Sequence, residues 1–232
     1  MSLQLLTIQH WLKKHATYRP NHPAIVFEDK RLTYKQLHQE VSRLSNAFIA
    51  AGIGKGDKVA TLLANSLELW ETYWACAAIG AVAVPLSPLL RGEGLFNLLD
   101  NSDTKLVITS QNLTEHVDAI RKRLKNIPPN NYWITDDVED GFKNYHTQKQ
   151  QHPAEPTAVA DVTGDDLYNI IYSSGTTGLP KGIVISHEVR ALYGSLVANA
   201  YRMTPEAVVM HSGSIIFNGS FLTLMPAMLL GC

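Results

Sequence analysis

Residues 58–85 have the sequence KVATLLANSLELWETYWACAAIGAVAVP, and this stretch decides the fold class. Its first seven residues are nearly all apolar, which is typical of a strand covered on both faces. Asn65 or Ser66 can then cap a helix, and Gly80 stands where that helix should end. The last five residues form a second apolar run. The stretch therefore predicts a strand–helix–strand unit with parallel strands.

The same alternation extends on both sides of this unit. Ahead of it, Thr33 and Gln36 can form a capping box, and Gly52 is placed to end the helix that they begin. Strands are predicted at 58–64, 81–85, 105–109, 132–135, 166–172 and 182–186, strand-like runs at 208–210 and 214–217, and helices at 33–52, 65–79, 94–101, 113–124, 187–201 and 222–230. The pattern predicts an α/β fold with mainly parallel sheets flanked by helices.

A polar stretch at 136–160 breaks the alternation. It contains two adjacent aspartates, the run QKQQ at 148–151, and prolines at 153 and 156. Such composition predicts an exposed connection, which could contain short local structure.

The bulk composition excludes several classes of protein. The chain has 232 residues, of which 45% are hydrophobic and 18% charged, and its formal net charge of −1 gives no basic surface for nucleic acid. The longest apolar run, 74–86, is too short for a membrane span and contains Gly80 and Pro85. Cys76 and Cys232 lack metal-ligand spacing, and no cleavable leader is evident. We expect a cytoplasmic protein.

The segment SSGTTGLPKG at 173–182 carries the most chemical information. Its three glycines let the backbone approach a ligand closely, its hydroxyl groups and amides can donate to an anion, and Lys181 adds a positive charge. No carboxylate interrupts the segment, as phosphate binding requires. It is not a Walker A loop, because Lys181 is followed by Gly182 rather than by Ser or Thr. The alternative is a plain surface turn between two strands.

This segment resembles the AMP-binding loop of the adenylate-forming superfamily, which includes acyl-CoA synthetases, peptide-synthetase adenylation domains and luciferases. The match extends from IYSSGTTGLPKG at 171–182 to His187. Further matches follow the family's order: PNHPAI at 20–25, LTYKQL at 32–37, GIGKGDKVA at 52–60, NSLE at 65–68 and GAVAVPLSP at 80–88. The resemblance covers essentially the whole chain.

The resemblance implies that a carboxylic acid is activated with ATP and magnesium, through an acyl-adenylate that a thiol, commonly that of coenzyme A, then captures. The phosphate contacts that it implies are Ser173, Ser174, Gly175, Thr176, Thr177, Gly178 and Lys181. Among these, Lys181 and Thr176 are the expected catalytic residues, because charge builds up on the departing pyrophosphate.

The family is roughly three times as long as this chain. The resemblance therefore implies that the magnesium ligand, the catalytic lysine and the C-terminal lid domain lie beyond Cys232, and that the chain alone is inactive. It also implies a division into one subdomain of residues 1–57 with 205–232 and a second of residues 58–204.

The kind of acid is left open by the sequence. Where many acyl-CoA synthetases have Phe-His in the acyl-pocket region, this chain has Phe217 and Asn218. His211 and Asn218 could line that pocket or be structural, and His187 is expected to pack or cap rather than move protons. Alternatives are a fatty acyl-AMP ligase, a peptide-synthetase adenylation domain acting on a carrier-protein thiol, and a non-catalytic nucleotide-binding protein. The oligomeric state is not predicted.

Overall fold

The computed structural model describes residues 7–137, 139–156, 161–173 and 180–232. Its strands are β1 Pro23–Phe27, β2 Lys30–Thr33, β3 Lys58–Leu62, β4 Val82–Leu86, β5 Thr104–Thr109, β6 Tyr132–Ile134, β7 Lys143–Asn144, β8 Leu167–Ser173 and β9 Lys181–Ser186. Its α-helices are α1 Trp11–Tyr18, α2 Tyr34–Ala50, α3 Leu67–Ile79, α4 Gly92–Asn101, α5 Thr114–Arg121, α6 Tyr145–Gln150, α7 His187–Ala200 and α8 Phe221–Leu230. Short 3₁₀-helices occupy η2 Gln111–Leu113, η3 Pro129–Asn131 and η4 Asn218–Ser220.

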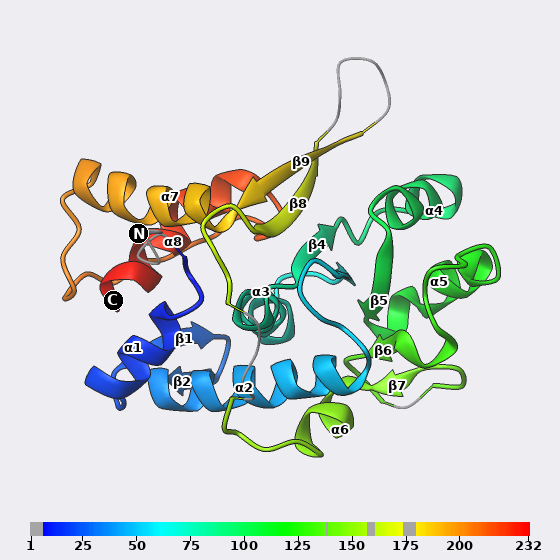
Figure 1. Ribbon diagram of the computed structural model, residues 1–232, viewed down its shortest axis with the longest axis horizontal. Coiled ribbons are helices and arrows are strands. Elements are labelled where there is room, and N and C mark those ends of the chain that lie inside the picture. Colours follow the sequence, from blue (N-terminus) through cyan, green and yellow to red (C-terminus); the bar gives the residue numbers. More distant parts are fainter. Residues whose placement is uncertain (1–6, 138, 157–160, 174–179) are drawn as a thin grey trace.

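One seven-stranded sheet forms the centre of the molecule, in the order β7-β6-β5-β3-β4-β8-β9 (Figure 1). Its strands pair in parallel except for β9, which pairs antiparallel with β8. The predicted fold class is therefore confirmed, and the three runs at 58–64, 81–85 and 105–109 lie in a single sheet, as expected.

Helices cover both faces of this sheet because successive strand residues point to opposite sides. On β5, Leu106 and Ile108 pack in the core that also holds the apolar residues of α2 and α3, whereas Val107 packs in a second core with those of α4 and α5. Figure 1 shows α2 and α3 on one side and α4 and α5 on the other. Burial on both faces explains why β3 and β4 are continuous apolar runs.

The helix between β3 and β4 has the ends that the sequence predicts. The Ser66 side chain accepts a hydrogen bond from the Leu69 amide at 3.1 Å, so Ser66 is the cap. Gly80 ends α3 with a φ of +72°, and a Cβ there would lie 3.1 Å from both Lys55 and Val162. Ahead of β3, the capping box of Thr33 and Gln36 begins α2 as predicted.

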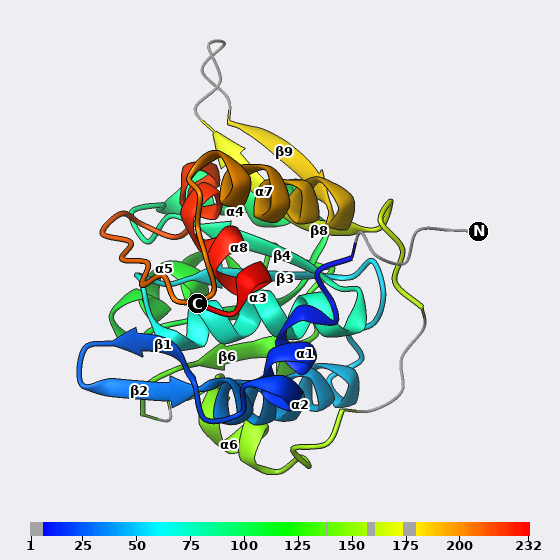
Figure 2. The same ribbon diagram turned by 90° about the vertical axis from the view of Figure 1, so that its left-hand side faces the viewer.

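A hairpin that the sequence analysis did not predict precedes α2. β1 and β2 form a separate two-stranded sheet, joined by Glu28 and Asp29 (Figure 2). Glu28 has a φ of +51°, a conformation that short hairpin turns usually obtain from Asn or Gly. Because the turn contains neither Asn nor Gly, the sequence did not indicate a hairpin at this position.

The described residues of the polar stretch at 136–160 include short local structure, part of which is buried. It contains β7 and α6, and the side chains of Tyr145 and Lys149 are buried. The Lys149 ammonium lies 2.8 Å from Glu71 on α3 and 2.7 Å from Glu40 on α2, and the Tyr145 hydroxyl donates to Glu71 at 2.8 Å. Burial raises the pKa of Glu71, although Lys149 and Tyr145 both oppose that shift. A buried ion pair thus fixes α6 against α2 and α3.

The runs at 208–210 and 214–217 are not strands, and this prediction was wrong. Val208 is 96% exposed and Met210 87% exposed. The β-branched and apolar character of these residues suits a sheet, but a strand also needs a neighbouring strand, and they have none among the described residues.

α8 is held at its C-terminal end by side chains from the start of the chain. His15 contacts the Leu229 carbonyl at 3.0 Å, Arg19 donates to the Gly231 carbonyl at 2.6 Å, and the Tyr34 hydroxyl donates to the Cys232 carbonyl at 2.9 Å. The proposed grouping of residues 1–57 with 205–232 stays a prediction. None of the helices in the described part of the chain is long and apolar enough to cross a bilayer.

Candidate active site

The predicted phosphate segment begins at the last residue of β8 and ends with the first two residues of β9, which is an edge strand of the sheet. β8 and β9 pair antiparallel along their whole lengths, and Ser173 lies opposite Lys181 in their register. The two ends of the segment are therefore neighbours. Figure 2 shows β9 at the top of the molecule, with α7 directly after it.

Five of the predicted phosphate contacts, Ser174, Gly175, Thr176, Thr177 and Gly178, lie outside the described residues. The other two, Ser173 and Lys181, are described, and both side chains are exposed. The Lys181 ammonium makes no hydrogen bond or ion pair with any residue that the structure describes. An exposed cation opposite a serine, with a Gly/Ser/Thr segment between them, suits a phosphate-bearing ligand.

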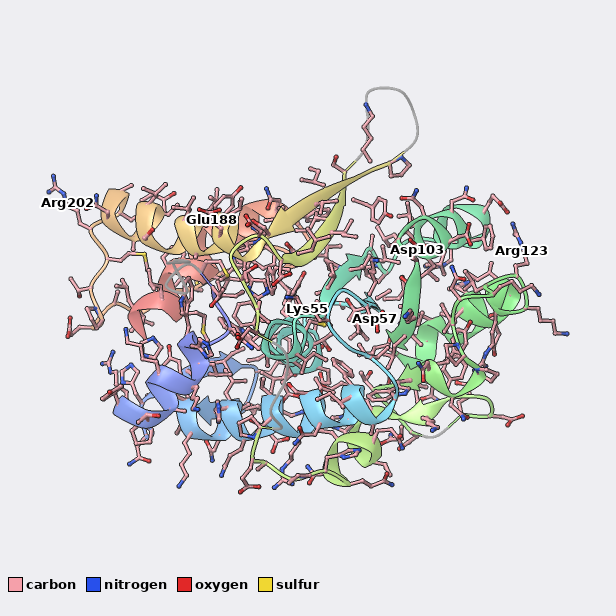
Figure 3. The ribbon with its side chains drawn as sticks, in the orientation of Figure 1. Lys55, Asp57, Asp103, Arg123, Glu188 and Arg202 are labelled. Carbon is pink, nitrogen blue, oxygen red and sulfur yellow. The ribbon has the colours of Figure 1, made fainter. Side chains whose placement is uncertain are left out.

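Polar contacts fix β8, which carries Ser173. Near its start, Lys55 forms an ion pair with Asp166 at 2.7 Å and donates to the Asp161 carbonyl at 2.9 Å (Lys55 is labelled in Figure 3). Burial alone would raise the pKa of Asp166, but Lys55 and Thr163 outweigh it and lower that pKa. Near its end, the Tyr172 hydroxyl donates to Asn101 at 2.7 Å. Both ends of the strand are therefore tied to the body of the molecule.

α7 continues directly from β9. Ser186 caps it by accepting from the Val189 amide at 3.4 Å, and Glu188 lies in its first turn (Figure 3). His187 is buried and packs edge-on against Tyr168, with 5.5 Å between ring centroids. Burial lowers the pKa of His187 to about 4, so the ring is neutral at physiological pH. Ser186 is thus the cap, and His187 is a packing residue in the described structure.

The sequence analysis missed Arg190, which is fully buried on the same helix. Its Nε and Nη2 donate to Asn169 Oδ1 at 3.4 and 3.2 Å, and its Cζ lies 3.8 Å from the centre of the Phe221 ring. Burial lowers its pKa to about 10. The available signal was its position, since Arg190 falls on the apolar face of α7 with His187 and Ala191.

The two residues suggested for the acyl pocket lie in different surroundings. Asn218, in η4, donates through Nδ2 to the Tyr193 hydroxyl of α7 at 3.4 Å. His211 contacts the Thr223 hydroxyl at 3.1 Å and lines a cavity of 360 Å³ between β1 and α8. That cavity is walled mainly by apolar side chains such as Ile25, Trp70 and Met228. The structure therefore does not bring His211 and Asn218 into one contact.

Two known proteins are similar to this chain over about three quarters of its length. The chain is 36% identical over 179 residues to the long-chain-fatty-acid–CoA ligase FadD13 of Mycobacterium tuberculosis, covering 76% of the chain and 34% of that protein. It is 33% identical over 184 residues to the fatty acid–[acyl-carrier-protein] ligase ScoC of Streptomyces coeruleorubidus, covering 79% of the chain and 34% of that protein. The chain thus spans about a third of the length of these relatives.

The solved structures include the N-terminal domain of FACL13 from Mycobacterium tuberculosis. It superposes with a TM-score of 0.80 at 29% identity, covering 97% of this chain and 55% of that one. The family model described as AMP-binding enzyme matches residues 12–232. The pairing of the strands agrees with this match, and the chain belongs to the family of AMP-binding enzymes.

Proposed function

We propose that this chain supplies the phosphate-binding part of an enzyme that activates a carboxylic acid with ATP and transfers the acyl group to coenzyme A. The observation that carries the proposal is the pair of Lys181 and Ser173. They face each other across the β8–β9 hairpin at the two ends of a segment rich in Gly, Ser and Thr. The names of FadD13 and ScoC support acid activation followed by transfer to a thiol.

The proposed reaction has two steps. A carboxylate oxygen attacks the α-phosphorus of ATP, and the bond to the pyrophosphate oxygen breaks, which leaves acyl-AMP and pyrophosphate. The coenzyme A thiol then loses its proton and attacks the acyl carbon, and AMP departs. In the first step negative charge accumulates on pyrophosphate, so the Lys181 cation stabilises the transition state more than the ground state.

Magnesium would neutralise part of the phosphate charge when bound with ATP. The hydroxyl groups of the segment suit the phosphates themselves rather than a dedicated metal site. Among the described residues, no group of three His, Cys, Asp or Glu side chains could hold a metal ion. We therefore assign none of the described residues to the ion.

Acid-dependent exchange of pyrophosphate into ATP tests the first step, measured on the complete product of the gene that encodes this chain. Exchange should require the acid and should fall in Lys181→Ala. Lys35→Ala is the matched control, because Lys35 is an exposed lysine on α2 that forms no described ion pair. Exchange that is independent of acid, or absent with every acid, would contradict the proposal.

The second step is tested by identifying the acylated product. Mass spectrometry should find acyl-CoA when coenzyme A is supplied. An acyl-carrier protein as the sole acceptor, or free acyl-AMP as the end point, would instead favour a carrier-protein ligase or a fatty acyl-AMP ligase. The 232-residue chain alone should show no more exchange than its own Lys181→Ala variant, because catalysis needs further groups held at reacting distance.

A further inference from the structure

The β8–β9 hairpin is joined to the rest of the sheet by a short register. Among the described residues, β4 and β8 are in register at one pair, Ala83 with Asn169, whereas β8 and β9 pair along their lengths. Figures 1 and 2 show the two strands reaching beyond the other strands of the sheet. Apolar side chains of β8 pack into both cores, but such packing is non-directional. The direction of the hairpin therefore depends on its polar contacts.

One turn at the base of this hairpin, just before β8, holds both of its strands. Asp166 Oδ2 accepts from the amide and the hydroxyl of Thr163 at 2.6 and 3.1 Å, which closes the turn. The carbonyls of Asp166 and Gly164 also accept from the amides of His187 and Glu188, both at 2.9 Å. Those two amides begin α7, which follows β9 directly. The start of β8 and the end of β9 are thus held at the same turn.

Lys55 connects this turn to the centre of the sheet. Its ammonium lies 2.7 Å from Asp166 Oδ2 and donates to the Asp161 carbonyl at 2.9 Å. Lys55 precedes the central strand β3 and lies in a turn that Asp57 closes by accepting from the Gly54 amide at 2.9 Å (Lys55 and Asp57 are labelled in Figure 3). A single cation therefore links the turn before β3 with the base of the hairpin.

This contact lies at the opposite end of the hairpin from the predicted phosphate ligands. Leu167 pairs with Ser186 at the base. Ser173 pairs with Lys181 six residues further along β8, which corresponds to about 20 Å. Over that length, a rotation of about 3° at the base would move Lys181 by about 1 Å. A displacement of about 1 Å can slow a reaction by up to about a hundredfold.

We propose that Lys55 is a positioning residue for the phosphates of ATP, because its contact with Asp166 fixes the direction of the β8–β9 hairpin and hence the place of Lys181. Both partners in the contact are partly exposed, and ion pairs of this kind contribute little to stability. The contact serves orientation instead. This inference rests on the proposed function, since it concerns the phosphates bound by the same segment.

Pyrophosphate exchange with the complete gene product tests this role. Lys55→Met removes the cation and keeps most of the side chain, and Asp166→Asn removes the opposite charge but keeps an oxygen for Thr163. Each variant should lower kcat/KM for ATP by about tenfold or more and leave the KM for the acid nearly unchanged. Lys55→Arg, which keeps the charge, should retain most of the activity. Thiol capture of supplied acyl-adenylate should be nearly unchanged in all three variants.

Lys105→Met is the matched control. It removes a Lys–Asp ion pair of similar length and exposure, with 2.6 Å between Lys105 and Asp57, that includes no residue of the hairpin. Exchange should be unchanged in this variant. Urea unfolding should show similarly small shifts for Lys55→Met and Lys105→Met, so that a difference in exchange reflects the place of the contact rather than folding.

Coupling between Lys55 and Lys181 distinguishes positioning from general support. If Lys55 acts through the place of Lys181, adding Lys55→Met to Lys181→Ala should lower exchange by less than about twofold further. A residue that merely supports the fold would lower exchange by the same factor in both backgrounds. The double variant is therefore compared with each single variant at the same ATP and acid concentrations.

Each result bears on the inference. Normal exchange in Lys55→Met and in Asp166→Asn overturns it and leaves the proposed function standing. Equal losses in Lys55→Met and Lys105→Met also overturn it, as do effects of Lys55→Met and Lys181→Ala that multiply. Absence of exchange with every acid in the natural protein overturns both proposals.

Discussion

Strands β4 and β9 belong to the same sheet and differ in almost every other respect. All five residues of β4 are buried, whereas the first four residues of β9 are exposed. β4 lies between two parallel neighbours, whereas β9, within the described residues, pairs with β8 alone and in the opposite direction. Only β8 separates the two strands. In the described part of the chain, the centre of this sheet is thus buried and its β9 edge is largely exposed, and we expect the two to differ in their roles.

The largest expected difference is between the buried Lys149 of α6, which should matter for stability, and the exposed Lys181 of β9, which should matter for catalysis. Lys149→Ala leaves the buried carboxylate of Glu71 without its cation, which should lower the free energy of unfolding by about 3–5 kcal/mol. Urea denaturation of the 232-residue chain measures the change. Lys55→Ala, which removes the more exposed pair with Asp166, should cost at most about 1 kcal/mol. Similar losses in the two variants would contradict the importance of burial.

Lys181→Ala should slow catalysis but hardly change stability. Its side chain is exposed and has no described partner, so stability should change by less than about 0.5 kcal/mol. Adenylate formation by the complete gene product should slow by about ten- to a thousandfold, because a charge on the leaving pyrophosphate loses its partner. Thiol capture of supplied acyl-adenylate should be nearly unchanged. If both half-reactions fell equally, Lys181 would support the arrangement of the protein rather than the leaving group.

His187, just after β9, should make stability depend on pH. Burial lowers its folded pKa to about 4 from 6.5, so between these values the unfolded chain binds the proton and the folded chain does not. The contribution is therefore fully present above pH 6.5 and is lost as the pH falls toward 4, by up to ~3 kcal/mol. Urea titrations from pH 4 to 7.5 should show a steeper dependence for the natural chain than for His187→Gln. Parallel curves would show that His187 titrates normally.

A matched pair of valines gives the smallest expected difference. Val84 on β4 is fully buried, and Val184 on β9 is 53% exposed. Removing two methyl groups should cost about 2 kcal/mol in Val84→Ala and less than about 0.5 kcal/mol in Val184→Ala. Equilibrium unfolding in urea compares them directly. A large loss in Val184→Ala would mean that the edge strand also maintains the fold.

The parts of the fold that could be predicted from the sequence depend on local signals. Thr33 with Gln36, Ser66 and Gly80 fix helix ends through their own side chain or backbone, and the structure confirms each of them. The buried strands were predictable because burial on both faces requires a continuous apolar run. The order of the strands in the sheet was not predicted, since it depends on contacts between distant residues.

The parts that could not be predicted depend on tertiary partners. Lys149 and Tyr145 are polar residues in a polar segment, and only Glu71 and Glu40 on other helices make their burial favourable. Val208 is a residue type that favours strands, but no strand lies beside it among the described residues, and it is exposed. Within the candidate site, the segment at 173–182 was recognisable because its residues resemble the AMP-binding loop of the family. The burial of Arg190 was indicated only by its place on the apolar face of α7, and its partner Asn169, 21 residues away, could not be inferred.

The attachment of α8 to α1 and α2 also concerns how the protein is made. The three hydrogen bonds from His15, Arg19 and Tyr34 join residues that are 214, 212 and 198 positions apart. At about 5–20 residues per second, a ribosome needs roughly 10–40 s to add the intervening chain. During that time the three donors lack their acceptors, and the α1 end of the buried core lacks α8. The first helices of this protein thus complete their packing only after Cys232 has been added.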